Sequence, residues 1–254
     1  MRVFAISDLH VDYEPNARWV QELSLVDYQN DVLIVAGDVS DSSNRLQACI
    51  ETLARRFRQV LFVPGNHDLW VRRDDPGLDS FGKFERTQRL VREAGASMDV
   101  FHHGDLSIVP LLGWYDGSFG PPSDELRMAW VDFRACRWPE GYEPHHTARD
   151  FMAMNRYERR SADETIISYS HFLPRLDVMP DRIPLDKRIV YPVLGSTALG
   201  EQVKALKPAV HVYGHSHVNR RVELDGTLYV NNAFAYPHET RIAAKTLVCV
   251  HEVR

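Results

Sequence analysis

Short apolar runs alternate with amphipathic stretches in the first third of the chain. Residues 32–36, VLIVA, are apolar throughout, which is typical of a strand buried on both faces of a sheet. Similar runs at residues 2–7 and 59–64 predict two more strands. Residues 46–57, which lie between two of these runs, carry apolar side chains at helical spacing. This strand–helix–strand order predicts a parallel sheet built from βαβ units.

The same patterns predict elements elsewhere in the chain. A helix is expected over residues 16–23, with Asn16 as its N-cap. Three more helices are predicted at residues 80–94, 147–160 and 198–207, and three more strands at residues 106–112, 165–170 and 209–213.

The C-terminal end differs from the rest. Alternating apolar residues at 220–224 and 227–231 flank Asp225-Gly226, a dipeptide that favours a hairpin turn. Another apolar stretch near residues 245–253 predicts a further strand. We expect these strands to form an antiparallel meander.

Length and composition set the class of protein. The chain has 254 residues, and no repeat or linker marks a boundary, so we predict a single domain over residues 1–254. An irregular insertion at about residues 69–164 could form a lid. Hydrophobic residues make up 44% and charged residues 26%, as in globular proteins. The three cysteines form no CxxC pattern, and no apolar run approaches the roughly 20 residues of a membrane span, which predicts a cytoplasmic protein.

Charge narrows the set of partners. The formal net charge of −5 provides no basic field for long nucleic acids or anionic membranes, and we expect neither as a partner. The sequence does not indicate an oligomeric state. Twelve histidines are many for this length, and histidine is the commonest metal ligand among side chains. Their positions therefore decide what the chain can bind.

Residues with metal-binding side chains follow five of the predicted strands. In chain order these segments are Asp8-Leu9-His10, Gly37-Asp38, Gly65-Asn66-His67-Asp68, Ser170-His171 and Gly214-His215-Ser216-His217. Ligands of open α/β sheets bind outside the carboxyl ends of the strands, so the segments can converge on one crevice. Residues i and i+2 of an extended chain point the same way, so Asp8 and His10 are expected to face one cation together. The same reasoning applies to His215 and His217.

The set offers two carboxylates, four imidazoles and one amide oxygen. That is too many for one tetrahedral ion, but it suits two ions if one carboxylate, most naturally that of Asp38, bridges them. Nitrogen and oxygen donors without thiolate favour Mn, Fe, Zn or Co. Two ions about 3.5–4 Å apart are a known apparatus for in-line displacement at phosphorus. A lone histidine after a strand is more often an ordinary surface or core residue, so the order of all five segments carries the prediction.

In this order the segments resemble the calcineurin-like metallophosphoesterase family. Its pattern is D-x-H, G-D, G-N-H-D/E, a lone H after a strand, and G-H-x-H, and the resemblance spans residues 8–217. It implies an α/β fold of four layers, α-β-β-α, in which two mixed β-sheets pack face to face. The later stretch YVNNAFAYPHE is similar to an N-x-x-G-Y-P-x-E segment of some bacterial and plant members, with Ala235 in place of the glycine.

The resemblance also implies a role for each residue of the segments. One ion would be held by Asp8, His10 and His217 and the other by Asn66, His171 and His215, with Asp38 bridging the two ions. His67 would contact the phosphate and donate a proton, with its ring oriented by Asp68. Asn66 would contact the substrate as well as a metal ion.

We therefore expect a dinuclear metal-dependent hydrolase of phosphate esters, in which a metal-bridged hydroxide attacks phosphorus and His67 is the proton donor. Mn is favoured over Fe or Zn, and the expected substrate is a small phosphoester, either a monoester or a diester. A nuclease or nucleotide pyrophosphatase on the same metal site is the alternative within enzymes, and a non-catalytic scaffold is the alternative outside them. Arg134 and Arg137 could clamp a phosphate or could belong to a solvated loop.

Overall fold

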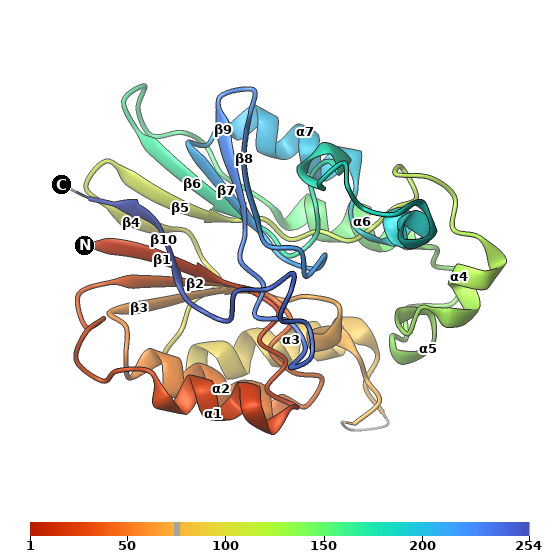
Figure 1. Cartoon of the computed structure of the whole chain (residues 1–254), viewed down its shortest axis with the longest axis horizontal. Coiled ribbons are helices and arrows are strands. Elements are labelled where there is room, and N and C mark those ends of the chain that lie inside the picture. The colour runs from red at the N-terminus through yellow and green to blue at the C-terminus, as the bar shows by residue number, and fades with distance from the viewer. Residues whose placement is uncertain (74–76, 254) are drawn as a thin grey trace.

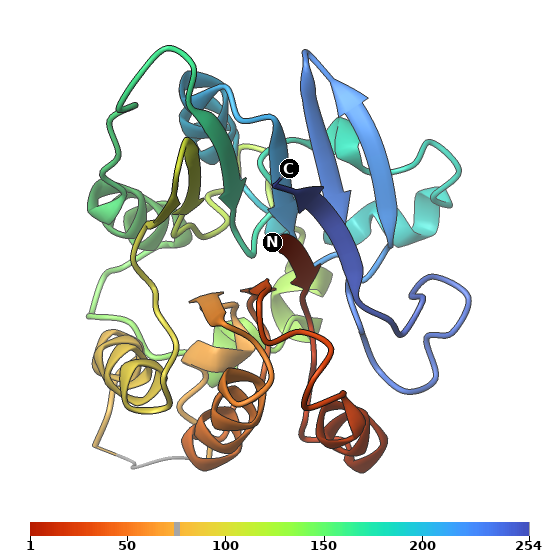
Figure 2. The ribbon, with the colours of Figure 1, turned by 90° about the vertical axis from the view of Figure 1, so that its left-hand side faces the viewer.

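Two β-sheets lie face to face with helices on their outer faces (Figures 1 and 2). The computed structural model describes residues 1–73 and 77–253. The first sheet has the strand order β10 (Val248–Glu252), β1 (Arg2–Ile6), β2 (Val32–Ala36) and β3 (Gln59–Val63). The second has the order β4 (Phe101–His103), β5 (Leu106–Pro110), β6 (Thr165–Tyr169), β7 (Val210–Tyr213), β9 (Thr227–Asn231) and β8 (Arg220–Leu224). The predicted four-layer α-β-β-α architecture is confirmed.

Both sheets are mixed: the first has one antiparallel edge strand, and the second has two. Strands β1, β2 and β3 are parallel, and β10 pairs antiparallel with β1. Strands β5, β6, β7 and β9 are parallel, while β4 and β8 are antiparallel edges. The parallel strands of both sheets run away from the end of the molecule that carries the two termini (Figure 1). Their carboxyl ends therefore meet at the opposite end.

Strand β2 shows how the sequence produces this packing. All five of its residues are buried. Leu33 and Val35 pack in the core between the first sheet and its helices, whereas Val32, Ile34 and Ala36 pack between the two sheets. Because a strand alternates its side chains between two faces, a strand with a core on each side must be apolar at every position.

Helices cover the outer faces. The first sheet is covered by α1 (Glu14–Glu22), α2 (Ser43–Ala54) and α3 (Ser80–Glu93), and the second by α6 (Pro144–Met154) and α7 (Thr197–Leu206) (Figure 1). Three 3-10 helices, η1 (His67–Leu69), η2 (Leu176–Val178) and η3 (Leu185–Val193), lie in loops. Two short helices, α4 (Asp124–Ala129) and α5 (Asp132–Ala135), project beyond the carboxyl ends of the strands. No helix in the described residues is both long and apolar enough to cross a membrane.

The predicted start of the first helix is wrong. Helix α1 begins at Glu14, with Pro15 in its first turn, where the fixed φ of proline favours a helix start. Asn16 is buried inside this turn, and its amide donates hydrogen bonds of 2.8 Å and 3.0 Å to the carbonyl oxygens of Leu9 and Ala235. Asn16 therefore ties distant loops together and does not cap the helix.

Two other helices are displaced from their predicted positions. Helix α2 covers Ser43–Ala54 where residues 46–57 were predicted, and α6 covers Pro144–Met154 where residues 147–160 were predicted. Each begins one turn earlier than the apolar spacing indicates. The apolar pattern marks the packed face of a helix and does not mark its first turn.

The predicted C-terminal meander is only partly right. Strands β8 and β9 form the expected hairpin, with Asp225 and Gly226 in left-handed conformations at φ 51° and 80°. Strand β9, however, pairs parallel with β7, and β10 crosses to the first sheet and pairs antiparallel with β1. This crossing covers the edge of β1 and carries residues 232–247 past the ends of the parallel strands.

Residues 69–164 are not all outside the layered fold. Helix α3 packs on the first sheet, and β4 and β5 belong to the second. Residues 116–143, which include α4 and α5 and are called the projecting segment below, extend away from the layers (Figure 1). That this segment acts as a lid stays a prediction.

Candidate metal centre

The predicted metal ligands all lie at the carboxyl ends of parallel strands. Asp8 and His10 follow β1, Asp38 follows β2, Asn66 follows β3, His171 follows β6, and His215 and His217 follow β7. Six of them are buried, and the side chain of His217 is 13% exposed. The structure thus brings together seven side chains that lie as much as 209 residues apart between Asp8 and His217.

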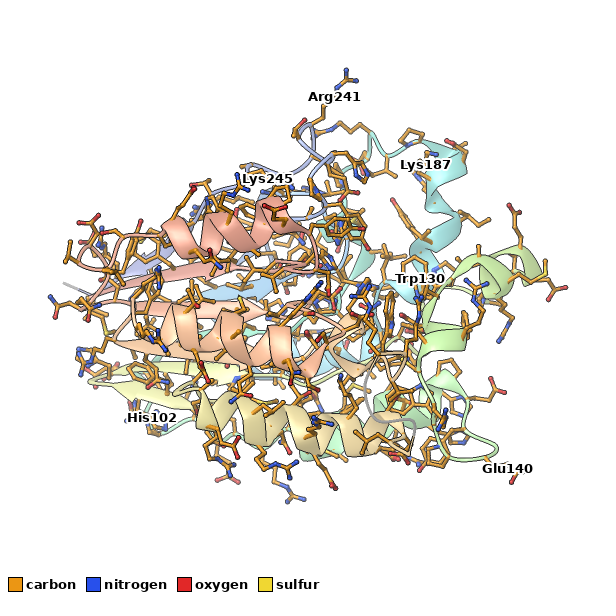
Figure 3. All side chains as sticks on the ribbon, turned by 90° about the horizontal axis from the view of Figure 1, so that it is seen from below. His102, Trp130, Glu140, Lys187, Arg241 and Lys245 are labelled. Carbon is orange, nitrogen blue, oxygen red and sulfur yellow. The ribbon has the colours of Figure 1, made fainter. Side chains whose placement is uncertain are left out.

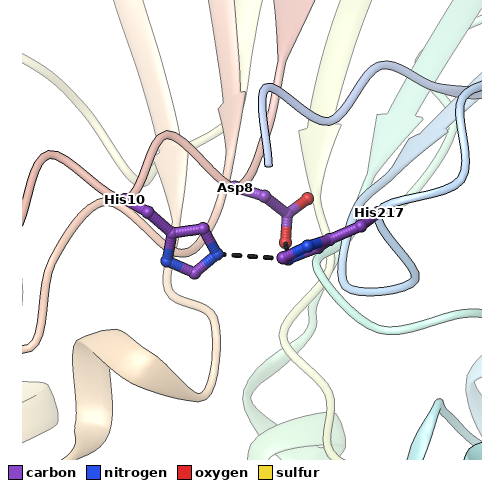
Figure 4. Close-up of side chains that lie close together, drawn as sticks. All are labelled: Asp8, His10 and His217. Atoms are coloured by element: carbon purple, nitrogen blue, oxygen red, sulfur yellow. Dashed lines mark hydrogen bonds and ion pairs between the residues drawn. The ribbon is translucent and has the colours of Figure 1, made fainter. Parts of the chain in front are cut away.

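Three of these side chains form one group. His10 Nε2 lies 3.1 Å from His217 Nε2, and His217 Nε2 lies 3.3 Å from Asp8 Oδ1 (Figure 4). Ligand atoms of one ion with bonds near 2.1 Å are separated by about 3 Å, so this spacing suits a single cation.

A second group lies beside the first. His171 Nε2 is 3.1 Å from both Asn66 Oδ1 and His215 Nδ1, and 3.5 Å from Asp38 Oδ2. Asp38 Oδ2 is also 3.9 Å from His10 Nε2 in the first group. The Asp38 carboxylate therefore lies between the two groups, as a bridging ligand would.

The far nitrogens of three imidazoles are held by acceptors. His171 Nδ1 donates to Ala36 O at 2.9 Å and His215 Nε2 to Val193 O at 2.9 Å. His217 Nδ1 donates to Glu239 Oε2 at 2.7 Å. Because a carbonyl or carboxylate oxygen only accepts, each ring carries a proton on that side and can turn a lone pair toward the centre. The lone pairs of His171 Nε2 and His215 Nδ1 face one another at 3.1 Å, which a bound cation would stabilise, so the residues fit a metal site.

Five of the seven residues have a left-handed backbone. Their φ angles are 53° at Asp8, 42° at His10, 58° at Asp38, 67° at His215 and 56° at His217. Such a conformation costs an L-residue roughly 1–2 kcal/mol and concentrates at functional sites. The prediction that an extended chain points Asp8 and His10 the same way is therefore wrong, although both residues do reach one group. The same prediction for His215 and His217 is also wrong, because His215 lies in the second group and His217 in the first.

The glycines that precede the ligands allow the loops to approach. A Cβ atom on Gly65 would lie 2.1 Å from Asp38 Oδ1. Gly37 has φ +83°, and a Cβ atom there would lie 2.5 Å from His171 Nδ1. No larger residue fits at either position without moving a ligand.

A cavity of about 360 Å³ opens onto this centre. Its polar end includes Asp38, Asn66, His67, His215 and His217. Its walls are largely apolar and come from the projecting segment, from the end of η3 and from the crossing before β10; they include Trp130, Val131, Val190, Leu194 and Tyr236. A phosphoester can therefore reach the centre while the rest of the substrate contacts apolar side chains.

The sequence profile of the calcineurin-like phosphoesterases matches residues 1–219. The chain belongs to this family. The predicted recognition and the predicted enzyme class, a metal-dependent phosphoesterase, are confirmed.

Two comparisons with individual phosphoesterases agree with this membership. The chain is 28% identical over 265 residues to the [acyl-carrier-protein] phosphodiesterase PptH of Mycobacterium tuberculosis, covering 94% of this chain and 79% of the relative. It is also similar to the crystal structure of the phosphopantetheinyl hydrolase PptH from the same organism, with a TM-score of 0.78 and 25% identity over 98% of this chain and 95% of the other.

Burial sets the protonation of the imidazoles in this phosphoesterase. It lowers the pKa of His215 to about 3 and lowers the pKa of His10 and His171, so these rings are neutral and ready to bind a cation. Burial would also lower the pKa of His217, but Asp8 and Glu239 raise that pKa to about 9. A cation that binds at His217 must therefore displace a proton.

The Asp38 carboxylate, which lies between the two groups, is surrounded by groups that disfavour its ionised form. Burial, together with the nearby carboxylates of Asp68 and Asp8, raises the pKa of Asp38 well above its usual range. A cation on either side would reverse this shift, because opposite charge favours the ionised form.

The structure gives Asp68 a role different from the predicted one. Its two oxygens accept hydrogen bonds from the backbone amides of four loop residues, namely Asp38, Val39, Ser40 and Gly65. Because these amides belong to the loops that carry the ligands, Asp68 shapes those loops. Its hydrogen bonds in the described chain do not include one to the ring of His67. The His67 ring instead stacks on Trp70 with ring centroids 3.6 Å apart. Its Nε2 lies 3.9 Å from Asp38 Oδ2.

Two acidic residues of this site were not predicted from the sequence. Glu239 supports His217, and its signal was the end of the YPHE segment. Asp132 lies in the projecting segment and accepts a hydrogen bond from Asn66 Nδ2 at 2.8 Å, with no motif to mark it. The two arginines considered as phosphate clamps, Arg134 and Arg137, are exposed and do not line the cavity.

Proposed function

We propose that this phosphoesterase binds two divalent cations. One would be held by Asp8, His10 and His217 and the other by Asn66, His171 and His215, with Asp38 bridging both. The observation that carries this proposal is the position of the Asp38 carboxylate between two separate donor groups. The donors are nitrogen and oxygen without thiolate, which favours Mn, with Fe and Zn as alternatives.

Two cations at these groups would polarise the phosphoryl oxygens and supply the nucleophile for in-line displacement. The residues of the chain orient the ester and donate a proton to its leaving group. His67 lines the cavity, and we propose that its ring contacts the phosphate and gives a proton to the departing oxygen. Burial lowers the pKa of His67, but the negative charge of a bound phosphate favours its protonated form. Asn66 can also contact the substrate, because its amide carries two N–H groups and gives only one to Asp132.

We propose a phosphodiester that joins a phosphopantetheinyl group to a carrier protein as the substrate. The relative PptH is an [acyl-carrier-protein] phosphodiesterase and a phosphopantetheinyl hydrolase. The cavity supports the same class here, because apolar walls lead away from a polar floor and suit an ester with a long organic arm. The proposed substrate is thus a protein-linked ester, whereas a small phosphoester was expected from the sequence.

We also propose that the enzyme works in the cytoplasm. Cys49, Cys136 and Cys249 are free thiols, which suits a reducing compartment.

A panel of substrates tests the proposed function. The Mn-loaded protein would be offered a phosphopantetheinylated carrier protein, mono- and bis(4-nitrophenyl) phosphate, a dinucleotide pyrophosphate and an oligonucleotide. We expect mass spectrometry to show removal of the phosphopantetheinyl group from the carrier, with the Asp38→Asn variant as the inactive control. Turnover restricted to the monoester, the pyrophosphate or the oligonucleotide would contradict the proposed substrate.

A further inference from the structure

Asp132 is a buried carboxylate that connects the projecting segment to the metal centre. It lies in α5 and is 2% exposed. Three side-chain N–H groups donate to it: Asn66 Nδ2 at 2.8 Å, Trp70 Nε1 at 2.7 Å and Trp130 Nε1 at 2.7 Å. A buried carboxylate is tolerated when several donors satisfy its oxygens, so this arrangement keeps Asp132 in place as an acceptor.

The bond to Asn66 determines which way its amide faces. The oxygen and nitrogen of an amide are nearly the same size, so hydrogen-bond partners decide the orientation. A carboxylate accepts and does not donate, so the NH₂ group of Asn66 must face Asp132. Asn66 Oδ1 then lies on the other side, 3.1 Å from His171 Nε2. An amide turned by 180° would present N–H groups to a cation and could not bind it.

The two tryptophans held by Asp132 flank the centre. The Trp70 ring stacks on His67 with centroids 3.6 Å apart. The Trp130 ring contacts His215 edge-on with centroids 5.8 Å apart. Trp130 lies on the side of the projecting segment that faces the rest of the molecule (Figure 3) and lines the cavity together with Val190 of η3. One carboxylate thus fixes three side chains that touch residues of the centre.

We propose that Asp132 is a positioning residue that fixes the Asn66 amide with its oxygen toward the second cation. In the same way it holds Trp70 and Trp130 against His67 and His215. The inference rests on the proposed role of Asn66 as a ligand. Through Asp132, the projecting segment is a structural part of the metal centre, in addition to any role in covering that centre.

The test compares two buried aspartates with similar bonding. Asp132→Leu keeps a side chain of similar size but has no acceptor, so Asn66, Trp70 and Trp130 all lose the oxygen to which they donate. Asp31→Leu is the matched control, because Asp31 is 4% exposed and also accepts three N–H hydrogen bonds, all from Arg2. Titration calorimetry with Mn²⁺ on metal-free protein would measure both sites. NMR of the indole N–H groups would report on the tryptophans without any metal.

In Asp132→Leu we expect the affinity for the second ion to fall about 10–100-fold, as for other residues that orient a ligand, with little change at the first. The indole N–H resonances of Trp70 and Trp130 should shift in the metal-free protein. Asp31→Leu should leave the metal affinities and these resonances unchanged. Wild-type affinity for both ions in Asp132→Leu, despite shifted indole resonances, would reduce Asp132 to a packing residue and overturn the inference.

A second variant provides a test if Asp132→Leu does not fold. Trp130→Phe removes one donor and leaves the contact between Asp132 and Asn66, so it should bind the second ion within about threefold of wild type, well short of the 10–100-fold loss above. A loss of second-ion affinity in Trp130→Phe as large as 10-fold would show that Asp132 acts on the second ion through Trp130 and not through Asn66. Binding of a single ion by the wild-type protein would instead contradict the proposed function.

Discussion

At the scale of single residues, the glycines at positions 37 and 65 cannot be replaced by a larger residue without moving a ligand. Gly65→Ala should abolish metal binding, because its Cβ atom would lie 2.1 Å from Asp38 Oδ1 and 2.7 Å from His171 Cε1. We also expect the free energy of unfolding to fall by about 1–3 kcal/mol, as for other overpacked cores. Metal analysis and urea unfolding would measure both effects.

Gly104→Ala is the control for this prediction. Gly104 also has a left-handed backbone, at φ +56°, but a Cβ atom there would meet no atom within 4 Å. It should cost only the backbone strain of about 1–2 kcal/mol and leave metal binding intact. A Gly65→Ala protein that binds metal normally would show that the loops can separate without loss of the site.

The proposed role of His67 predicts a dependence on the leaving group. An alkoxide needs protonation as it departs, whereas 4-nitrophenolate is stable without it. In His67→Ala, turnover of an alkyl phosphodiester should therefore fall by a further 10²–10⁴-fold relative to that of a 4-nitrophenyl ester, the usual contribution of a general acid. Steady-state rates on the two esters, with metal content checked, would measure the ratio. Equal losses on both would make His67 an electrostatic contact only.

The candidate ligands could be predicted from the sequence because each is a metal-binding residue type directly after an apolar strand. Their left-handed backbone could not, since nothing in Asp8 or His10 as residue types requires it. At Ala235 the sequence does indicate a left-handed backbone, because related segments carry glycine there, and the φ of Ala235 is 62°. Asp132 had no signal, because its partners Trp70 and Trp130 are recognised only when the chain is folded.

At the scale of elements, the strands of the parallel centres were predictable because both faces are buried. The run at β2 is apolar throughout for this reason. The pairing of β10 was not predictable, because its alternating pattern suits an edge position in either sheet. The first turn of α1 was mispredicted because Asn16, a common N-cap residue, is used for tertiary hydrogen bonds instead.

A buried histidine in strand β7 should make the stability of the fold depend on pH. His211 of β7 is buried between the hydroxyls of Ser168 and Ser170, and burial lowers its pKa to about 3. The unfolded chain takes up a proton near pH 6.5 and the folded chain does not, so His211 destabilises the fold as pH falls below 6.5. Each pH unit below that value should remove about 1.4 kcal/mol until the folded ring itself titrates.

Urea unfolding of metal-free protein at pH 7 and pH 5.5 would measure this effect. In His211→Gln the loss of unfolding free energy between the two pH values should be smaller than in wild type by about 1 kcal/mol. The exposed His145, changed in the same way, is the control. The same pH dependence in His211→Gln and wild type would mean that His211 is protonated in the folded protein.

At the scale of the whole molecule, the two sheets and the projecting segment converge on one metal centre. The first sheet supplies Asp8, His10, Asp38 and Asn66, and the second supplies His171, His215 and His217. Since the two donor groups meet at Asp38, the packing of sheet on sheet sets their separation. The family and the layered fold follow from strand-end motifs, whereas the cavity depends on the projecting segment and on η3, whose sequences carry no regular pattern.

Metal stoichiometry tests the central claim most directly. Equilibrium dialysis against Mn²⁺ followed by elemental analysis would compare wild type with Asp38→Asn and His10→Ala. We predict two ions per chain in wild type, weakened binding of both in Asp38→Asn, and weakened binding of only one in His10→Ala. One tightly held ion in active wild-type protein, unchanged in Asp38→Asn, would contradict a centre in which Asp38 joins two cations.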